Sequence, residues 1–542
     1  MSLNYNFIWL LCYLLVLVGL AGYGFHRLSI VYLYWKNRNN KPQPKARFQE
    51  LPVVTVQLPM FNEKFVVDRL LESVAALDYP QDKLEIQILD DSTDDTTEQC
   101  YRKVEELKSR GFDAVCIHRT DRTGFKAGAL EAATKVAKGE FLLILDADFV
   151  PEPDLLQKTI HFFTDENVGL VQTRWGHINR EYNLLTRIQG MYLDGHFAME
   201  QTARNRSGRF FTFNGTAGIW RKCVIGDAGG WSHDTLTEDM DLSYRVQLRG
   251  WRFIYLNDVV TPAELPVDMD GFKSQQHRWT KGSIQVCQKI LLDIWRSNAP
   301  LKAKVEATTH LTCNYSYLLL ALLCFLVYPI CTQRIPENET VFMWFVNVAL
   351  FFMTSVAVCI FYMSAQIVVR PKSWWKELPY LPLLLTLSVG MAVNNAKAVL
   401  EAIFGHQSAF VRTPKYGVDR KEDRRHVSQL KRNGYRAIKS VVIPVLEIAC
   451  GTFFLNLIII MIRQGHYLSP ILMIPFLGFY YTGFCSLGRM ISNLLPAKQT
   501  AKAKNWRLYH ACASLASSTP DSTRRRSFRC VRSPGILFPS GL

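Results

Sequence analysis

Long apolar runs without charged side chains constrain this chain most strongly. Phe7–Phe25 contains no Asp, Glu, Lys or Arg and is long enough to cross a hydrocarbon core about 30 Å thick. Comparable stretches, carrying at most one charged residue each, occupy Leu311–Gln333, Phe342–Val369, Ser440–Ile462 and Tyr467–Gly488. The sequence therefore predicts a protein that crosses a membrane several times.

The positions of the basic residues predict the orientation of these segments in the membrane. Six Lys and Arg residues lie between positions 27 and 47, which places that flank of the first span on the cytoplasmic side. A cleaved signal peptide is the alternative, but the first six residues hold no Lys or Arg and no small-residue cleavage site stands out. We therefore expect residues 1–35 to form an uncleaved transmembrane anchor.

One further apolar stretch, Leu378–Phe404, decides the number of crossings. It contains two prolines and two charged residues, and the basic segments on either side of it both favour the cytoplasmic face. We expect it to lie in the membrane interface as an amphipathic helix. This leaves five spans in the plasma or inner membrane, with the N-terminus outside and the C-terminus inside.

The net charge of +16, from 63 Lys and Arg against 47 Asp and Glu, fits segments that face anionic lipid, and nucleic acid is not needed to explain it. The thirteen cysteines are scattered and never form a CxxC pair, so neither a zinc knuckle nor a disulfide framework is indicated. The basic tail, residues 495–542, is rich in Ser and Arg and is predicted to be disordered, with no function assigned.

Residues 51–172 lack this apolar character and alternate β-rich runs with helical stretches. The expected strands are Val53–Leu58, Glu85–Leu89, Ala114–His118 and Phe141–Leu145. Such alternation predicts an α/β domain with a mostly parallel sheet. In sheets of this kind ligands bind beyond the carboxyl ends of the strands, so the polar residues there are the candidates for function.

Acidic residues follow two of these strands. Asp90 and Asp91 end the second, and Asp146 and Asp148 follow the later apolar one. Each alone is compatible with an ordinary cap or turn, but carboxylates that converge in one crevice repel unless a cation lies among them. Carboxylate oxygens suit Mg²⁺ or Mn²⁺, which also bind substrate phosphates. No P-loop is present; Lys126 is either a phosphate-facing cation or a solvated residue of a first helical turn.

Two later motifs are also candidates. Thr237, Glu238 and Asp239 open a predicted helix, where acidic residues are common as caps. Gln275 and Arg278 lie three residues apart on one face of a predicted amphipathic helix. The Trp279 that follows is either an anchor in the membrane interface or a platform for a sugar, with Arg278 as a phosphate clamp.

In this order the motifs resemble a processive family 2 glycosyltransferase of the GT-A type, over about residues 50–490. The runs Pro59–Glu63, Leu89–Asp94 and Phe213–Gly218 are closest to plant cellulose-synthase-like mannan and glucan synthases, and the bacterial cellulose synthase catalytic subunit is more distant. Residues 410–415 resemble the gating-loop pattern Phe-x-Val-Thr-x-Lys of cellulose synthases, but Arg412 stands where that pattern has Val.

The resemblance implies a division of the chain and a role for each motif. The divisions are the anchor, a cytoplasmic GT-A domain (50–270), an interfacial helix (271–300), two spans (311–370), a second interfacial helix (376–404), a basic gating-like loop (405–439), two spans (440–490) and the tail. The implied donor residues are Asp90, Asp91, Lys126, Asp146, Gln275 and Arg278, with Asp146 and Asp148 at the Mg²⁺ or Mn²⁺. Asp239 would be the general base, with Glu238 and Thr237 beside it; the acceptor side would hold Trp279, Phe213, Asn214, Gly215 and Thr216, and the gating loop Phe410, Thr413 and Lys415.

The implied activity is that of an inverting hexosyltransferase. It would polymerise UDP-glucose or GDP-mannose into a β-linked, β-1,4 glycan and export the polymer through its own transmembrane channel. UDP-glucose and a β-1,4-glucan are the first expectation, with mannan or glucomannan next. Two alternatives are a non-processive enzyme that adds one sugar to a membrane lipid, and a membrane binding or transport protein with a vestigial nucleotide domain.

Overall fold

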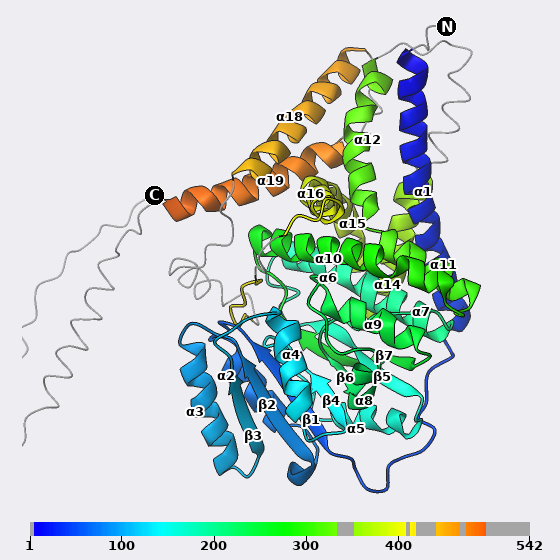
Figure 1. The fold of residues 1–542 in the computed structure, drawn as a ribbon. Coiled ribbons are helices and arrows are strands. Elements are labelled where there is room, and N and C mark those ends of the chain that lie inside the picture. Colours follow the sequence, from blue (N-terminus) through cyan, green and yellow to red (C-terminus); the bar gives the residue numbers. More distant parts are fainter. Residues whose placement is uncertain (1–4, 333–351, 408–411, 419–440, 465–472, 495–542) are drawn as a thin grey trace, which may run out of the picture. The chain divides into compact units, whose positions relative to one another are not determined.

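The computed structural model describes residues 5–332, 352–407, 412–418, 441–464 and 473–494 (Figure 1). Residues 1–492 form one compact unit, and everything below concerns that unit. The predicted tail from 495 to 542, the segment 342–351 and Phe410 lie outside the described residues.

A seven-stranded mixed sheet forms the centre of the lower domain, in the order β3-β2-β1-β4-β6-β5-β7. The first three neighbour pairs and the β5–β7 pair are parallel, and β6 runs antiparallel to both β4 and β5. The strands are β1 (Val54–Met60), β2 (Leu84–Asp90), β3 (Asp113–His118), β4 (Phe141–Ile144), β5 (Val168–His177), β6 (Gly218–Arg221) and β7 (Arg252–Ala263). The predicted α/β class with a mostly parallel sheet is confirmed.

Alternating side chains give the sheet two apolar faces, as the two-residue period of a strand requires. In β4, Leu143 packs into the core on one face while Leu142 packs into the core on the other. The first core is shared with α2 (Val67–Ala75), α3 (Thr96–Ser109) and α5 (Leu155–Thr159), and the second with α4 (Phe125–Val136), α8 (Lys222–Asp227) and α9 (Glu238–Leu248). The sheet is therefore buried between two layers of helices.

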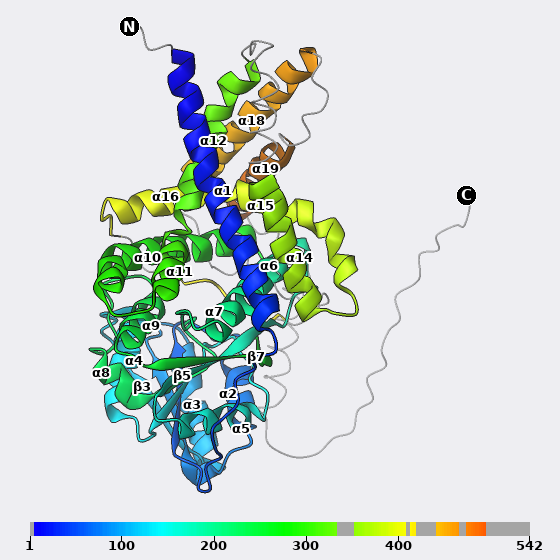
Figure 2. The same ribbon diagram turned by 90° about the vertical axis from the view of Figure 1, so that its right-hand side faces the viewer.

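Several helical segments connect this domain to the apolar helices, some of them between β5 and β6 in the chain and the others after β7. They are α6 (Leu184–Asp194), the π-helical turn η3 (Gly195–Gln201), α7 (Thr202–Arg206), α10 (Met269–Arg296) and α11 (Leu301–Thr312). Figures 1 and 2 show α10 and α11 lying across the domain, beneath helices that point away from it. The carboxyl ends of the strands face the same side, so the predicted ligand edge lies under α10.

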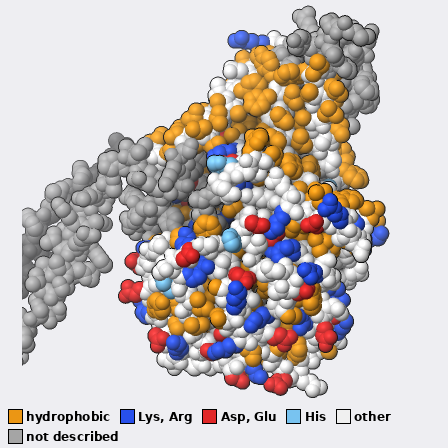
Figure 3. All heavy atoms as spheres, in the orientation of Figure 1, with side chains coloured by type: hydrophobic (Ala, Val, Ile, Leu, Met, Phe, Trp, Pro, Cys, Tyr) orange, Lys and Arg blue, Asp and Glu red, His pale blue; other side chains and the backbone are white. Residues whose placement is uncertain are grey.

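Apolar helices from both ends of the chain account for the long uncharged runs. They are α1 (Tyr5–Asn37), α12 (Tyr315–Thr332), α14 (Ala357–Val369), α15 (Leu381–Gly390), α16 (Ala392–Ile403), α18 (Val442–Arg463) and α19 (Met473–Leu494), with short turns η4 (Phe352–Val356) and η5 (Trp374–Tyr380). Hydrophobic side chains cover the surface of this part, whereas Lys, Arg, Asp and Glu are spread over the sheet domain (Figure 3).

Two of the described helices, Ile8–Asn37 and Val442–Arg463, are by themselves long and apolar enough to cross a membrane. Two bent pairs would raise the number to four if each acts as one span: Leu301–Thr312 with Tyr315–Tyr328, bent by 52°, and Trp374–Gly390 with Ala392–Ile403, bent by 41°. The second pair is the stretch for which the sequence predicts an interfacial helix. Five spans and their orientation stay a prediction.

Candidate active site

A cavity of about 210 Å³ lies at the carboxyl ends of β1, β2, β4, β5 and β7, closed on the other side by α10. It gathers residues that are far apart in the sequence. Those of the predicted set that line it are Asp91, Lys126, Asp146, Asp148, Asn214, Gly215, Thr237, Glu238, Asp239, Gln275, Arg278, Trp279, Thr413 and Lys415. Asp90, Phe213 and Thr216 do not line it, and Phe410 lies outside the described residues.

The two acidic residues at the end of β2 have different surroundings. Asp91 lines the cavity and accepts two hydrogen bonds from Arg119, at 2.8 Å from Nε and 2.6 Å from Nη2. Asp90 is fully buried, where its carboxylate accepts from the Ser92 backbone N–H (3.0 Å) and contacts His118 Nδ1 (2.7 Å). Asp91 is therefore the one that can face a ligand, and Asp90 shapes the turn beneath it.

Asp146 and Asp148 follow β4 and each contacts a lysine. Lys126 Nζ lies 2.6 Å from Asp146 Oδ1, and Lys415 Nζ lies 2.5 Å from Asp148 Oδ2. Burial disfavours the charge of Lys126, but the neighbouring carboxylates of Asp146 and Glu238 outweigh it and raise the lysine pKa. The carboxylates that would repel one another are thus compensated by amino groups of the protein itself.

This donor set fits a divalent cation that is held jointly with a substrate. Within the described residues no group of three or more His, Cys, Asp and Glu side chains could hold an ion alone. Mg²⁺ and Mn²⁺ commonly use one or two carboxylates together with phosphate oxygens and water. Asp146 and Asp148 would supply those two carboxylates, and a diphosphate would be the other partner of the ion.

Asp239 lies in the first turn of α9, where its carboxylate accepts from the Met240 backbone N–H (2.8 Å). Burial, and then the charge of Glu238, raise the pKa of Asp239 to about 7. Gly215 closes over it: its φ is +79°, and a Cβ there would lie 3.1 Å from Asp239 Oδ2. A buried carboxyl group whose pKa lies near neutrality is suited to accept a proton at physiological pH.

The amphipathic helix α10 brings the third motif into the cavity. Gln275, Arg278 and Trp279 all line it, and Trp279 packs beside Leu193 and Leu265. Burial lowers the pKa of Arg278, although Glu238, Asp146 and Asp239 oppose the shift. The guanidinium group therefore stays a cation next to the carboxylates, which is the arrangement that a departing diphosphate needs.

The run after α7 splits between cavity and core. Asn214 and Gly215 face the cavity, whereas Phe213 is buried against Trp220 with ring centroids 5.4 Å apart. Thr216 is fully buried, and its Oγ1 accepts the backbone N–H of Asp146 at 2.8 Å. Thr216 thus positions the turn that carries Asp146, and Phe213 supports the sheet.

Residues 412–418 lie against the cavity, which Arg412, Thr413 and Lys415 line. Arg412, the position that departs from the gating-loop pattern, pairs with Glu63 after β1. The backbone N–H groups of residues 416–418 donate to the Glu264 carboxylate, at 2.9 to 3.2 Å. Charge pairs therefore hold this segment on the sheet in the structure, and burial raises the pKa of Glu63 to about 7 although Arg412 opposes it.

Several cavity residues were absent from the sequence-based prediction, among them Trp175, His177 and Arg122. Trp175 and His177 lie at the end of β5, where Trp175 stacks on Phe197 with ring centroids 4.5 Å apart. The rule that ligands bind at strand ends would have pointed to both, had the β5 strand been recognised. Arg122, which lies 3.3 Å from the centre of the Phe61 ring, has no comparable signal in the sequence.

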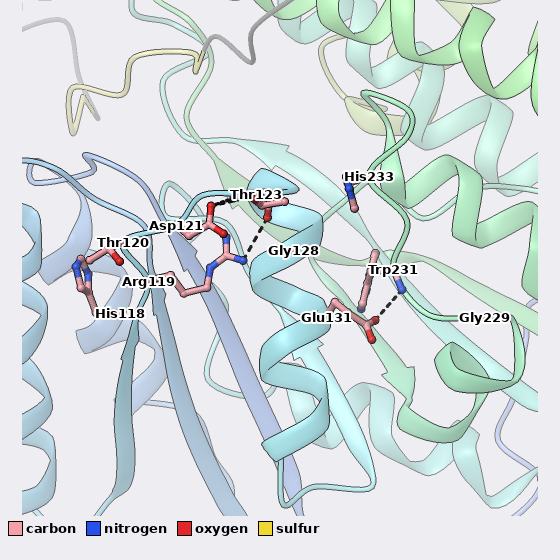
Figure 4. Close-up of a pocket in the computed structure, with 10 residues that line it drawn as sticks. All are labelled: His118, Arg119, Thr120, Asp121, Thr123, Gly128, Glu131, Gly229, Trp231 and His233. Atoms are coloured by element: carbon pink, nitrogen blue, oxygen red, sulfur yellow. Dashed lines mark hydrogen bonds between the residues drawn. The ribbon is translucent and has the colours of Figure 1, made fainter.

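A second hollow, wider and more open, lies on the other side of α4 (Figure 4). It is lined by Arg119 and Asp121 on one side and by Trp231 and His233 on the other, and Glu131 accepts the Trp231 backbone N–H at 3.0 Å. Arg119 is the residue that holds Asp91 from behind. No residue of the four predicted motifs lines this hollow, and Asp91 is connected to it only through Arg119.

Comparison with known proteins agrees with this geometry. The family model described as "Glycosyltransferase like family 2" matches residues 52–282, and the model "Cellulose synthase" matches residues 218–464. Glucomannan 4-β-mannosyltransferase 2 of Arabidopsis thaliana is 42% identical over 286 residues, and glucomannan 4-β-mannosyltransferase 1 of Oryza sativa subsp. japonica is 40% identical over 277. Each alignment covers 50% of this chain and 53% of the relative, so the chain spans about half the length of the curated relatives it matches.

Among solved structures, the mannosyltransferase PcManGT from Pyrobaculum calidifontis, in complex with GDP-Man and Mn²⁺, superposes with a TM-score of 0.51 at 19% identity. The superposition covers 73% of this chain and all of that one, and it confirms the GT-A fold. Residues 52–282 are therefore similar to family 2 glycosyltransferases and have the GT-A fold, residues 218–464 are similar to cellulose synthase, and the chain is similar to the plant glucomannan mannosyltransferases.

Proposed function

We propose that this protein is a membrane-embedded, inverting hexosyltransferase that polymerises a nucleotide-activated hexose into a β-1,4-linked glycan. One observation carries the proposal: a single cavity gathers Asp91, the Asp146–Asp148 pair, Asp239 and the Gln275, Arg278 and Trp279 face of α10. A nucleoside diphosphate requires cations and a metal-ligating pair, and a sugar acceptor requires a base and an aromatic platform. The cavity offers both sets side by side.

The chemistry follows from the positions of the side chains. Asp239 takes the proton from the acceptor hydroxyl as that oxygen attacks the anomeric carbon of an α-linked donor, which yields the inverted β-linkage. Arg278 and Lys126 offset the negative charge that builds up on the leaving diphosphate. Trp279 stacks on the terminal sugar of the acceptor, as an aromatic ring at the edge of a cavity can. A Mg²⁺ or Mn²⁺ ion, when held by Asp146 and Asp148, supplies further charge neutralisation at the diphosphate.

Mannose is the first donor sugar to test, ahead of the glucose expected from the motifs, because the two curated relatives are named as mannosyltransferases. The protein would be purified in detergent and supplied with radiolabelled GDP-mannose or UDP-glucose and Mn²⁺. A polymer that β-1,4-mannanase digests supports the proposal, and one that cellulase digests changes only the sugar. A lipid that carries a single sugar as the product would favour the non-processive enzyme over the polymerase. Absence of any donor turnover would refute the proposed enzymatic activity.

The membrane-type helices are the second half of the proposal. A growing glycan is polar, and its hydroxyl groups would lose their hydrogen-bond partners in bare lipid. Because the cavity lies directly beneath α10 and the apolar helices start above it, we propose that synthesis is coupled to export through those helices, with the sheet domain in the cytoplasm. Lipid, nucleotide sugar and the nascent glycan would then be the partners of the protein.

A further inference from the structure

A chain of hydrogen bonds leads from the cavity into the neighbouring helices through one side-chain amide. Asn214 Nδ2 lies 3.0 Å from His196 Nε2, and Asn214 Oδ1 lies 2.6 Å from Gln201 Nε2. His196 Nδ1 in turn lies 3.0 Å from Glu200 Oε2. Three of these four residues belong to the single π-helical turn η3, a type of turn that is frequent at functional sites.

The chemistry of donors and acceptors fixes every proton in this chain. Gln201 Nε2 also lies 2.7 Å from the Thr212 carbonyl oxygen, which can only accept, so the amino group of Gln201 is the atom that faces Asn214. Asn214 must then receive that bond with its carbonyl and turn its own amino group towards His196. His196 Nε2 consequently accepts, and the ring proton sits on Nδ1, where it is donated to the Glu200 carboxylate.

The surroundings maintain this neutral form of the imidazole. Glu200 is buried and pairs with Arg27 of α1 and with Arg204, whose Nη1 lies 3.3 Å from Glu200 Oε2. Burial, together with the positive charges of Arg204 and Arg27, lowers the pKa of His196. A protonated ring would carry a hydrogen on Nε2 and could not accept from Asn214. The cations therefore favour the neutral ring, and the hydrogen bonds select its tautomer.

These contacts use one N–H and one lone pair of the Asn214 amide, which leaves the other N–H and lone pair for a ligand. Asn214 lines the cavity and precedes Gly215, where an added Cβ would lie 3.1 Å from Asp239 Oδ2. We propose that His196 is a positioning residue: it orients Asn214 so that the remaining N–H donates to a hydroxyl of the acceptor sugar beside Asp239. This inference rests on the proposed function, and it adds a specific residue to acceptor recognition.

The test compares acceptor and donor binding in full-length protein purified in detergent. His196→Leu removes the acceptor for the Asn214 N–H and is expected to raise the KM for a β-1,4-linked manno- or cello-oligosaccharide roughly tenfold, the cost of one misplaced hydrogen bond. The affinity for GDP or UDP with Mn²⁺ should change less than twofold. His196→Gln, whose carbonyl can accept the same N–H, should stay within about threefold of the wild-type KM.

A double variant separates positioning from general stability. If His196 acts through Asn214, then His196→Leu combined with Asn214→Ala should be no worse than Asn214→Ala alone. His161→Leu is the matched control, because His161 is also buried and accepts a hydrogen bond, from the Phe48 backbone N–H at 3.2 Å, on a different element. It should leave the KM for the acceptor unchanged.

Additive effects in the double variant, or equal losses of nucleotide and acceptor affinity, would overturn the inference. Should His196→Leu fail to fold, His196→Gln and Asn214→Asp decide the question. A carboxylate at position 214 cannot donate to Nε2, so a roughly tenfold rise in KM is expected for Asn214→Asp and near-normal values for His196→Gln; the reverse order would contradict the proposal. Wild-type protein that neither binds nucleotide nor transfers sugar would instead refute the proposed function.

Discussion

At the scale of single residues, the site carboxylates are paired with cations of the protein. Arg119 holds Asp91, Lys126 contacts Asp146, and Lys415 contacts Asp148. Removing one partner of a buried pair leaves an uncompensated charge, which is more costly than losing an exposed pair. If these carboxylates hold a diphosphate and its metal, as proposed, Lys126 and Lys415 are the groups already in contact with them.

Asp239→Asn tests the proposed base. The amide cannot accept a proton at neutral pH, so sugar transfer should fall by about 10²- to 10⁴-fold while nucleotide affinity stays nearly constant. In wild-type protein the rate should rise with pH through about 7, because the carboxylate form is the active one and burial raises the pKa of Asp239 to about 7. Initial rates between pH 5 and pH 9 measure both effects. A variant that keeps half of the wild-type turnover would exclude Asp239 as the base.

Asp148→Ala tests the metal site. Affinity for GDP or UDP in the presence of Mn²⁺ should fall, because one of the two carboxylate ligands is lost, and affinity without metal should change little. Isothermal titration with and without Mn²⁺ separates the two. Nucleotide affinity that is unchanged with Mn²⁺ present would argue that Asp148 serves another purpose, such as anchoring Lys415.

Sequence patterns predicted the strand ends but not which side chains turn into the cavity. Asp91 and Asp148 could be predicted because they lie within a few residues of the ends of apolar runs. In the run after α7, however, a turn with positive φ at Gly215 and Ala217 points Asn214 inwards and buries Phe213 and Thr216. That reversal depends on backbone torsions that no periodic pattern encodes, and His196 is recognisable only through its spatial contact with Asn214.

At the scale of elements, α10 connects the cavity of the sheet domain with the apolar helices. Its first half carries Gln275 and Arg278 towards the cavity, and its other face is fixed to the apolar helices. Lys273 is buried there, with its Nζ 2.5 Å from Glu447 Oε2 of α18 and 2.9 Å from Ser486 Oγ of α19. A charged pair is costly to bury among apolar helices. The Lys273–Glu447 pair therefore indicates a contact that matters for structure or function.

Lys273→Met should destabilise the protein, because it leaves the Glu447 carboxylate buried without its cation; breaking such a pair typically costs about 3–5 kcal/mol. Lys273→Met combined with Glu447→Leu should recover much of that loss, since both charges are gone. Thermal unfolding in detergent is the measurement. Lys108→Met, at an exposed pair with Glu105 on α3, is the control and should hardly shift the unfolding temperature. A double variant less stable than Lys273→Met would contradict the pairing.

Elements with a clear period were the most predictable. The expected strands and the helix that opens at Thr237 to Asp239 agree closely with the structure, because alternating and amphipathic patterns directly reflect burial on one face. The π-helical turn η3 and the short antiparallel strand β6 were not predicted. Their positions are determined by neighbouring elements, β6 pairing with β4 and β5, and not by local sequence.

At the scale of the whole molecule, the proposal requires the sheet domain to face the compartment that contains nucleotide sugars. Lys36 in the last turn of α1 favours a cytoplasmic location for this side by the positive-inside rule, which stays a prediction. One exposed cysteine of the sheet domain, Cys223 on α8, offers a direct readout of that orientation, whereas Cys100 is buried in the same domain.

A membrane-impermeant maleimide should therefore modify Cys223 only after cells are permeabilised, as measured by mass spectrometry of the peptide that contains it. Cys223→Ser removes the signal and serves as the control for specificity. Cys100 should stay unmodified under both conditions, because burial raises the pKa of its thiol and excludes the reagent. Modification of Cys223 in intact cells would place the cavity outside the cytoplasm. Asp91 and Asp239 would then be separated from cytoplasmic nucleotide sugars, and a coupled synthesis and export in the proposed direction would be physically impossible.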